Sequence, residues 1–183
     1  MIARVPGEVR LLYRFNADVL SARREDRRIT LDVKNWRPIA FTAKTPANAD
    51  AVMALQHSGA TLQHLNAIAG DQAVVAYYIE RFARGRLLAW DLADDEGELG
   101  RVNALANRYQ PRAVEAPPLA LSLCRFAYLR QEDGAGVLQS GAVPARLVLS
   151  PRGLVAFASA LAGEACDLGP ALWQLGFFDL AEP

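Results

Sequence analysis

With 183 residues, 52% of them hydrophobic, the chain is long enough to bury a core in one medium domain or two small ones. Its 20 basic and 20 acidic side chains cancel, which argues against a nucleic-acid binder, because such proteins gain affinity from excess positive charge facing phosphates. No apolar run approaches the ~20 residues of a membrane span, and the start, MIARVPGEVR, lacks the apolar core of a secretory signal. We therefore expect a cytoplasmic protein without membrane contact.

The first half of the chain predicts a small antiparallel meander followed by three helices. Ile29, Leu31 and Val33 alternate with polar residues, which is typical of a strand with one buried face. Capping residues and glycines then predict where helices begin and end. The three expected helices run from a Thr45 cap to Gly59, from a Thr61 cap to Gly70, and from about Asp71 to Arg84, before an extended segment, RLLAWDLAD.

The same order of signals begins again about 110 residues later. The phrase Leu12-Tyr13-Arg14-Phe15 returns as Leu123-Cys124-Arg125-Phe126, and three further strand-like pieces follow it. Ser150 and Pro151 then repeat the helix start made by Thr45 and Pro46. Finally, LWQLGFFDLAE resembles the closing segment of the first half. Units of this length are too long for a solenoid repeat and indicate two domains of one type.

The predicted fold class is α+β, with two winged-helix-like modules, each a three-stranded antiparallel sheet plus two to three helices. The first module spans 1–95 and the second, shorter one spans 119–183. Between them, 96–118 is expected to be a partly helical connector, with a helix around Leu99 to Tyr109.

Two stretches resemble known families. LSLCRFAYLRQEDGAGVLQSGAVPARLVLSPRGLVAFASALAG is similar to the region ahead of the flavin domain in SagB-type peptide dehydrogenases, the azoline oxidases that mature ribosomally made thiazole and oxazole peptides. VLSARREDRRITLDVKNWRPIAF with its helices resembles the PqqD-like peptide-recognition domains of those pathways. The resemblance implies a precursor (leader) peptide and a flavin-dependent dehydrogenase domain or subunit as partners. The flavin domain should follow this region, and the chain ends at Pro183 without it, so we expect no cofactor and no enzyme activity.

In a PqqD-like module, a leader peptide adds as a fourth strand between the third strand and the third helix, which places the site here on Ile39, Ala40, Phe41 and Thr42. Pro38 removes a donor at the start of this edge. On the third helix, Tyr77, Arg81 and Arg84 are spaced to form a stripe beside the one that holds Val75, Ile79 and Phe82. The alternative is that the second domain or another copy of the chain covers this edge.

No residue pattern in the sequence predicts catalysis or metal binding. Cys124 and Cys166 lie far apart without a neighbouring ligand, and His57 and His64 have no carboxylate or cysteine at ligand spacing. The repeated aromatic residues are predicted to pack in the cores: Tyr13, Phe15, Trp90, Phe126, Tyr128, Trp173 and Phe177. Three functions follow: a peptide-recognition or docking module, a structural or homodimerisation module, and a winged-helix DNA-binding regulator that would use Arg81, Arg84 and Arg86.

Overall fold

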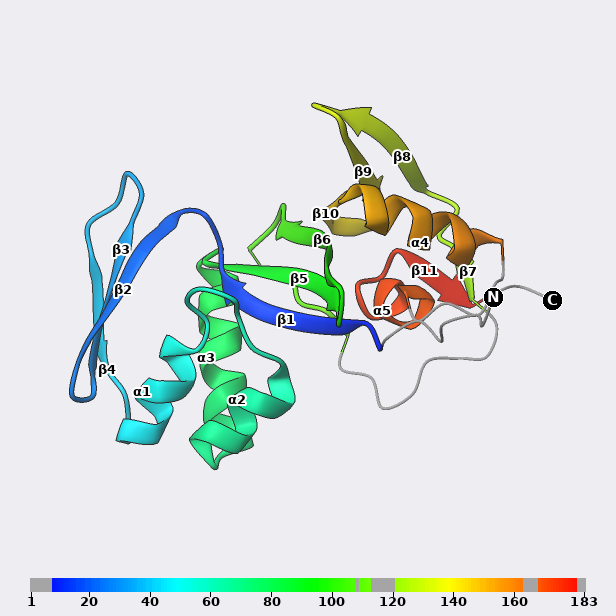
Figure 1. The fold of residues 1–183 in the computed structure, drawn as a ribbon. Helices are drawn as coiled ribbons and strands as arrows, with labels where there is room; N and C mark the ends of the chain where they lie inside the picture. The colour runs from blue at the N-terminus through cyan, green and yellow to red at the C-terminus, as the bar shows by residue number, and fades with distance from the viewer. Residues whose placement is uncertain (1–7, 108, 113–120, 163–167, 181–183) are drawn as a thin grey trace. The chain divides into compact units, whose positions relative to one another are not determined.

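The computed structural model describes residues 8–107, 109–112, 121–162 and 168–180 (Figure 1). The chain divides into two compact units, the first unit being Leu12–Trp90 and the second unit Met1–Leu11 with Asp91–Pro183. Helices and antiparallel sheets confirm the predicted α+β class.

The first unit contains a three-stranded sheet and three helices. Its sheet has the order β2-β3-β4, so that β3 is central and β4 is an edge. The helices follow the sheet in the chain, as the sequence predicts. The elements are β2 (Val19–Glu25), β3 (Arg28–Val33), β4 (Ile39–Thr42), α1 (Pro46–Met53), α2 (Leu62–Ala69) and α3 (Gln72–Arg84).

The sequence patterns correctly predicted the order of these elements and where the helices begin. Ile29 and Leu31 of β3 are fully buried, as their alternation predicts. The first two helices are capped by the expected threonines, and Thr45 Oγ1, for example, accepts a hydrogen bond from Asn48 N (3.1 Å). Asp71, the approximate start predicted for the third helix, caps that helix. The first helix is shorter than predicted. It ends at Met53, before Gly59, where the chain changes to tighter turns: Leu55 N donates to the Val52 carbonyl (3.1 Å) and Gln56 N to the Met53 carbonyl (3.0 Å).

The second unit holds most of a larger sheet. The complete strand order is β1-β5-β6-β10-β9-β8, and a separate two-stranded sheet pairs β11 with β7. Strands β1 and β5 each run across the limit between the two units. The remaining elements are β1 (Arg10–Phe15), β5 (Leu88–Asp94), β6 (Gly97–Ala104), β7 (Leu121–Leu123), β8 (Ala127–Glu132), β9 (Ala135–Ser140), β10 (Val143–Leu149), α4 (Pro151–Leu161), α5 (Leu168–Gln174) and β11 (Phe178–Leu180).

The helix predicted for the connector around Leu99 to Tyr109 is wrong. Most of this segment is strand β6, which pairs antiparallel with β10, with Val102 opposite Leu147 and Gly100 opposite Leu149. Pairing with a neighbouring strand has overridden the local helical pattern, because each β6 backbone group that faces β10 gains a partner there. Residues 113–118 of the predicted connector lie outside the described residues.

Hydrogen bonds join the start of helix α4 to strand β6. The Ser150 hydroxyl donates to the carbonyls of Glu98 and Leu99 (3.1 Å each) and also caps the helix by accepting from Gly153 N (3.1 Å). Arg152 Nη2 donates to Asp94 Oδ2 (2.6 Å), and this hydrogen bond lowers the pKa of the Asp94 carboxyl. The capped helix start that the sequence predicts is therefore confirmed, and it also fixes the position of β6.

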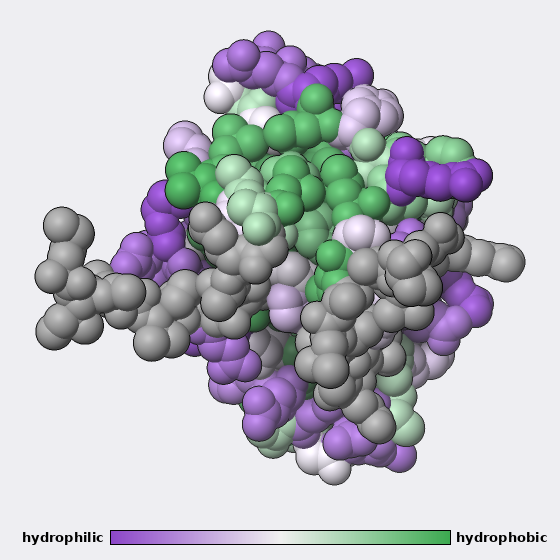
Figure 2. All heavy atoms as spheres, turned by 90° about the vertical axis from the view of Figure 1, so that its right-hand side faces the viewer, coloured by the Kyte–Doolittle hydropathy of each residue, from purple (hydrophilic) through white to green (hydrophobic). Residues whose placement is uncertain are grey.

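The prediction that all repeated aromatic residues lie in cores is partly wrong. Phe15, Trp90 and Phe177 are buried, but Phe126 and Tyr128 are 54% and 50% exposed. The repeated phrase falls on strand β1 in the first half and on a turn before β8 in the second, so its side chains meet different surroundings. Figure 2 shows hydrophobic side chains gathered on one face, and the exposed large apolar residues of the second unit include Phe126, Leu129, Val155 and Leu161.

Candidate functional site

The outer edge of β4 is the first feature of the candidate site. Strand β4 pairs with β3 on one side, in a register that places Phe41 opposite Ile29 and Ile39 opposite Leu31. Within the described residues no strand pairs with its other side. An edge of this kind presents backbone donors and acceptors to any extended segment that approaches it.

The register identifies which backbone groups point outward. Ala43 N donates to the Arg27 carbonyl (2.8 Å), and these two residues continue the register of β3 and β4. Hydrogen-bonded pairs alternate along an antiparallel ladder, so Phe41 and Ile39 also direct their N–H and C=O groups toward β3. Ala40 and Thr42 therefore direct theirs toward the open edge. The edge offers two donors and two acceptors at the i, i+2 spacing that an added strand needs.

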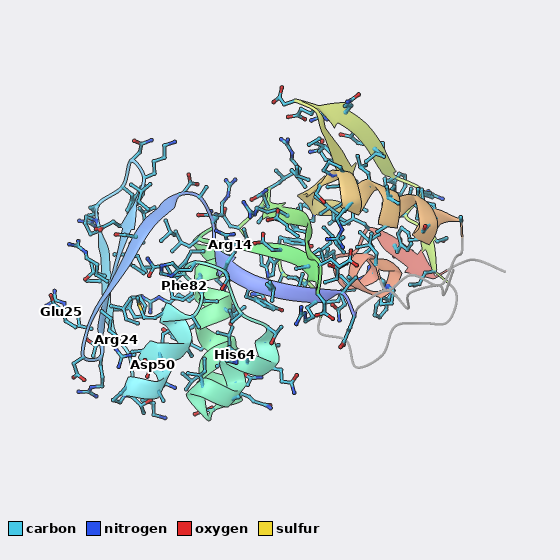
Figure 3. All side chains as sticks on the ribbon, viewed as in Figure 1. Arg14, Arg24, Glu25, Asp50, His64 and Phe82 are labelled. Carbon is cyan, nitrogen blue, oxygen red and sulfur yellow. The ribbon has the colours of Figure 1, made fainter. Side chains whose placement is uncertain are left out.

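Helix α3 packs against the inner face of this strand through aromatic rings. The Phe41 ring lies 5.8 Å from the rings of both Tyr78 and Phe82. Phe82, which is labelled in Figure 3, also contacts Phe15. The two ring centroids lie 5.4 Å apart, and Phe82 is 2% exposed. Val75 and Ile79 are buried as well. The predicted buried stripe of α3 is therefore confirmed, and it fixes the helix beside β4.

The predicted polar stripe of α3 is exposed next to the buried one. Tyr77 is 53% exposed, and its ring makes an edge contact with Tyr78. Arg81 Nη1 donates to Tyr77 Oη (2.8 Å), so these two side chains are joined along the helix. Arg84 forms an ion pair with Glu80, as the i, i+4 spacing predicts. Tyr77 and Arg81 thus form the part of the stripe that no acidic residue neutralises among the described residues.

A hollow of about 610 Å³ lies at the beginning of β4, within the first unit. Ile39 lines it from the strand, and Gly85, Arg86 and Leu87 line it from the segment after α3. The turn between β3 and β4 contributes Lys34 and Trp36. Neither the hollow nor the place of Trp36 in its lining was predicted, because the fold decides that the turn between β3 and β4 lies near the end of α3.

The second unit shows what an occupied edge of the same kind looks like. In both halves a meander of three strands leads to a helix with a Thr-Pro or Ser-Pro start, so β10 corresponds to β4. The outer side of β10 is filled by β6, antiparallel, from Ala104 opposite Ala145 to Gly100 opposite Leu149. One half of the chain therefore carries an added fourth strand, and the other half leaves the corresponding edge open.

The structure brings the predicted site residues together in part. Ile39, Ala40, Phe41 and Thr42 form β4, and Tyr77, Arg81 and Arg84 lie on α3, which packs against that strand. Their predicted role in peptide binding stays a prediction. Of the four strand residues, only Ala40 and Thr42 direct their backbone N–H and C=O groups toward the open edge.

Other groups of the described residues form no comparable site. No three His, Cys, Asp or Glu side chains among them are grouped to hold a metal ion. Within the same part of the chain, no helix has both the length and the apolar character needed to cross a membrane. Cys124 is buried and its sulfur lies 3.7 Å from Ser140 Oγ, whereas Cys166 lies outside the described residues. Burial raises the pKa of the Tyr13 hydroxyl, because desolvation disfavours its charged form.

Comparison with protein-family models and with curated proteins finds no match for this chain.

Proposed function

We propose that the chain is a non-catalytic peptide-recognition module that binds an extended leader peptide by strand addition to β4. In the wider proposal, which rests on the resemblance of the sequence, it acts beside a flavin-dependent azoline dehydrogenase in the maturation of ribosomal thiazole or oxazole peptides. The two halves are winged-helix-like modules of the PqqD type. The single observation that carries the proposal is the open edge of β4, whose counterpart on β10 is filled by β6.

The geometry of the edge indicates how a peptide would bind. Ala40 and Thr42 would each exchange hydrogen bonds with one peptide residue, which supplies affinity independent of sequence. Peptide side chains alternate between the two faces of the sheet, and those on the α3 side would lie against the helix that carries Tyr77 and Arg81. This arrangement selects a peptide with alternating character, apolar or acidic toward α3 and polar on the opposite side.

The most direct genetic test changes the outward backbone donor of β4. Thr42→Pro removes one outward N–H and leaves the bonds of Phe41 to β3 in place. We expect about a tenfold weaker affinity for the leader peptide, because a hydrogen bond worth about 1 kcal/mol is lost and the proline ring fills its position. Fluorescence anisotropy with labelled leader peptides measures this. Thr42→Val, which keeps the N–H, is the matched control and should bind like the parent.

Reversing the charge of Arg81 tests the helix side of the site. Arg81→Glu should weaken an acidic or amphipathic leader peptide by about 1 to 3 kcal/mol, because a charge-assisted contact is lost and a repulsion is added. Folding should change little, since the side chain is exposed. Arg125→Glu makes the same charge reversal on an exposed residue of the second unit and should leave the affinity unchanged. Equal affinities of the parent and Arg81→Glu, or no binding by either, would favour a purely structural module.

A homodimerisation role is the second candidate, and the exposed apolar residues of the second unit favour it. Phe126, Leu129, Val155 and Leu161 are each at least 45% exposed. Figure 2 shows hydrophobic side chains gathered on one face, and an exposed apolar patch commonly marks a protein–protein interface. Sedimentation velocity separates the two candidates, because a dimer that forms through this face does not require β4.

A further inference from the structure

The residue after α3 has an unusual backbone conformation. Arg86 has a φ of 56°, in the left-handed region, where residues other than glycine are disfavoured. Its N–H donates to the Ala83 carbonyl and Leu87 N donates to the Phe82 carbonyl, both at 2.9 Å. These bonds define a helix end whose left-handed position is usually occupied by glycine. The glycine stands one place earlier, at Gly85, where φ is −77° and any residue would fit.

An arginine at this position costs conformational energy that glycine would not. Strained residues of this kind concentrate where the side chain has a role in binding. The Arg86 backbone is held in place by Asn16, whose Nδ2 donates to its carbonyl (2.5 Å), and the side chain is exposed. Asp26, Asn35, His57 and Asp133 also have a positive φ, so this conformation does not by itself assign a role to Arg86, and the groups around the exposed guanidinium have to indicate one.

Arg86 lines the hollow at the beginning of β4 together with Lys34 and Trp36. Neither Lys34 nor Arg86 forms an ion pair with any described residue, and Trp36 is 69% exposed. Two negative groups repel an anion here. One is the Asp18 carboxylate, which also lines the hollow, and the other is the C-terminal end of α3, which carries about half a negative charge. The two full positive charges outweigh both, so the hollow favours a single negative group with an apolar stem that can pack on Trp36.

We infer that this hollow binds a carboxylate of the bound peptide, located on the C-terminal side of the segment that pairs with β4. The inference rests on the proposed function. Its direction comes from the occupied edge, where β6 runs antiparallel to β10. A peptide that runs antiparallel to β4 has its C-terminal part at the beginning of that strand, beside Ile39 and the hollow. The carboxylate is either an Asp or Glu side chain or the peptide's own C-terminus.

The test begins with ligands selected from a displayed library of random 16-residue peptides, using the full chain as bait. We expect an acidic residue to be enriched C-terminal to the pairing segment. Synthetic copies of the best peptide, with a free or an amidated C-terminus and with the acidic residue changed to its amide, identify the source of the carboxylate. Arg86→Gly should weaken binding at least tenfold, to the same extent as loss of the carboxylate. Combining the two changes should cause no further loss.

Stability gives an independent readout. Arg86→Gly should raise the ratio of folded to unfolded protein about fivefold, because the left-handed strain is relieved. His57→Gly is the matched control: His57 is exposed, has a φ of 61° and lies outside the hollow, so this change should stabilise the chain and leave binding unchanged.

Two results would overturn this inference and leave the proposed function standing. In the first, Thr42→Pro weakens peptide binding but Arg86→Gly binds the same peptides as tightly as the parent. In the second, the selected peptides carry their acidic residue on the N-terminal side of the segment that pairs with β4. If the selected peptides bound Thr42→Pro as tightly as the parent, or if no binding peptide were found, both the proposed function and this inference would be contradicted.

Discussion

Replacing Phe82 by alanine should lower the free energy of unfolding of the first unit by about 3 to 5 kcal/mol, the usual cost of truncating a buried phenylalanine. Phe82 is 2% exposed, and its ring contacts the rings of Phe15, Phe41 and Tyr78. It therefore joins β1, β4 and α3. Since small domains are stable by only about 5 to 15 kcal/mol, this change should remove a large part of the stability of the unit.

Urea denaturation followed by circular dichroism measures the effect of Phe82→Ala. Tyr77→Ala is the matched control, because it truncates an aromatic residue of the same helix that is 53% exposed. The control should change stability by less than about 1 kcal/mol. If the two variants unfolded at the same urea concentration, the packing of α3 on β4 described above would be wrong.

The second large effect is expected from Gly153→Ala in α4. Alanine in a helix is usually more stable than glycine by about 1 kcal/mol, yet here the sign should reverse. A Cβ at this position would lie 1.8 Å from the Leu99 carbonyl oxygen of β6. Helix and strand must therefore separate, and the cost should be about 3 kcal/mol or more, at the upper end of overpacking.

Thermal unfolding of Gly153→Ala, compared with Gly141→Ala, tests this close contact. A Cβ at Gly141 meets no atom within 4 Å, so the control should stay within about 0.5 kcal/mol of the parent. A Gly153→Ala chain as stable as the parent would show that α4 does not approach β6 so closely.

Local signals in the sequence predicted much of the first unit. Helix starts are determined by short-range hydrogen bonds, so Thr45 and Thr61 could be assigned as caps, and a helix start near Asp71 predicted, from their neighbours alone. The alternation of Ile29 and Leu31 with polar residues predicted β3 for the same reason. The buried stripe of α3 required only helical periodicity.

Features that depend on distant parts of the chain could not be predicted. Strand β6 exists because β10 offers it an edge. The i, i+3 spacing of Leu99 and Val102 is typical of a helix face, whereas in β6 these two buried side chains point to opposite faces of the sheet. At the site, the four residues of β4 were predicted, but the ladder register decides that Ala40 and Thr42 face outward. Gly85 correctly marked the end of α3, whereas the left-handed conformation of Arg86 depends on how the chain continues into β5.

The central claim, that β4 accepts a peptide as an added strand, is tested most directly by amide hydrogen exchange of the full chain, measured by NMR with and without a bound peptide. In the free protein, the amides of Ile39 and Phe41 should be protected by β3, and those of Ala40 and Thr42 should exchange rapidly. Peptide binding should slow exchange at Ala40 and Thr42 at least tenfold and leave Phe41 almost unchanged. Unchanged exchange at Ala40 and Thr42 in a saturated complex would contradict strand addition to β4.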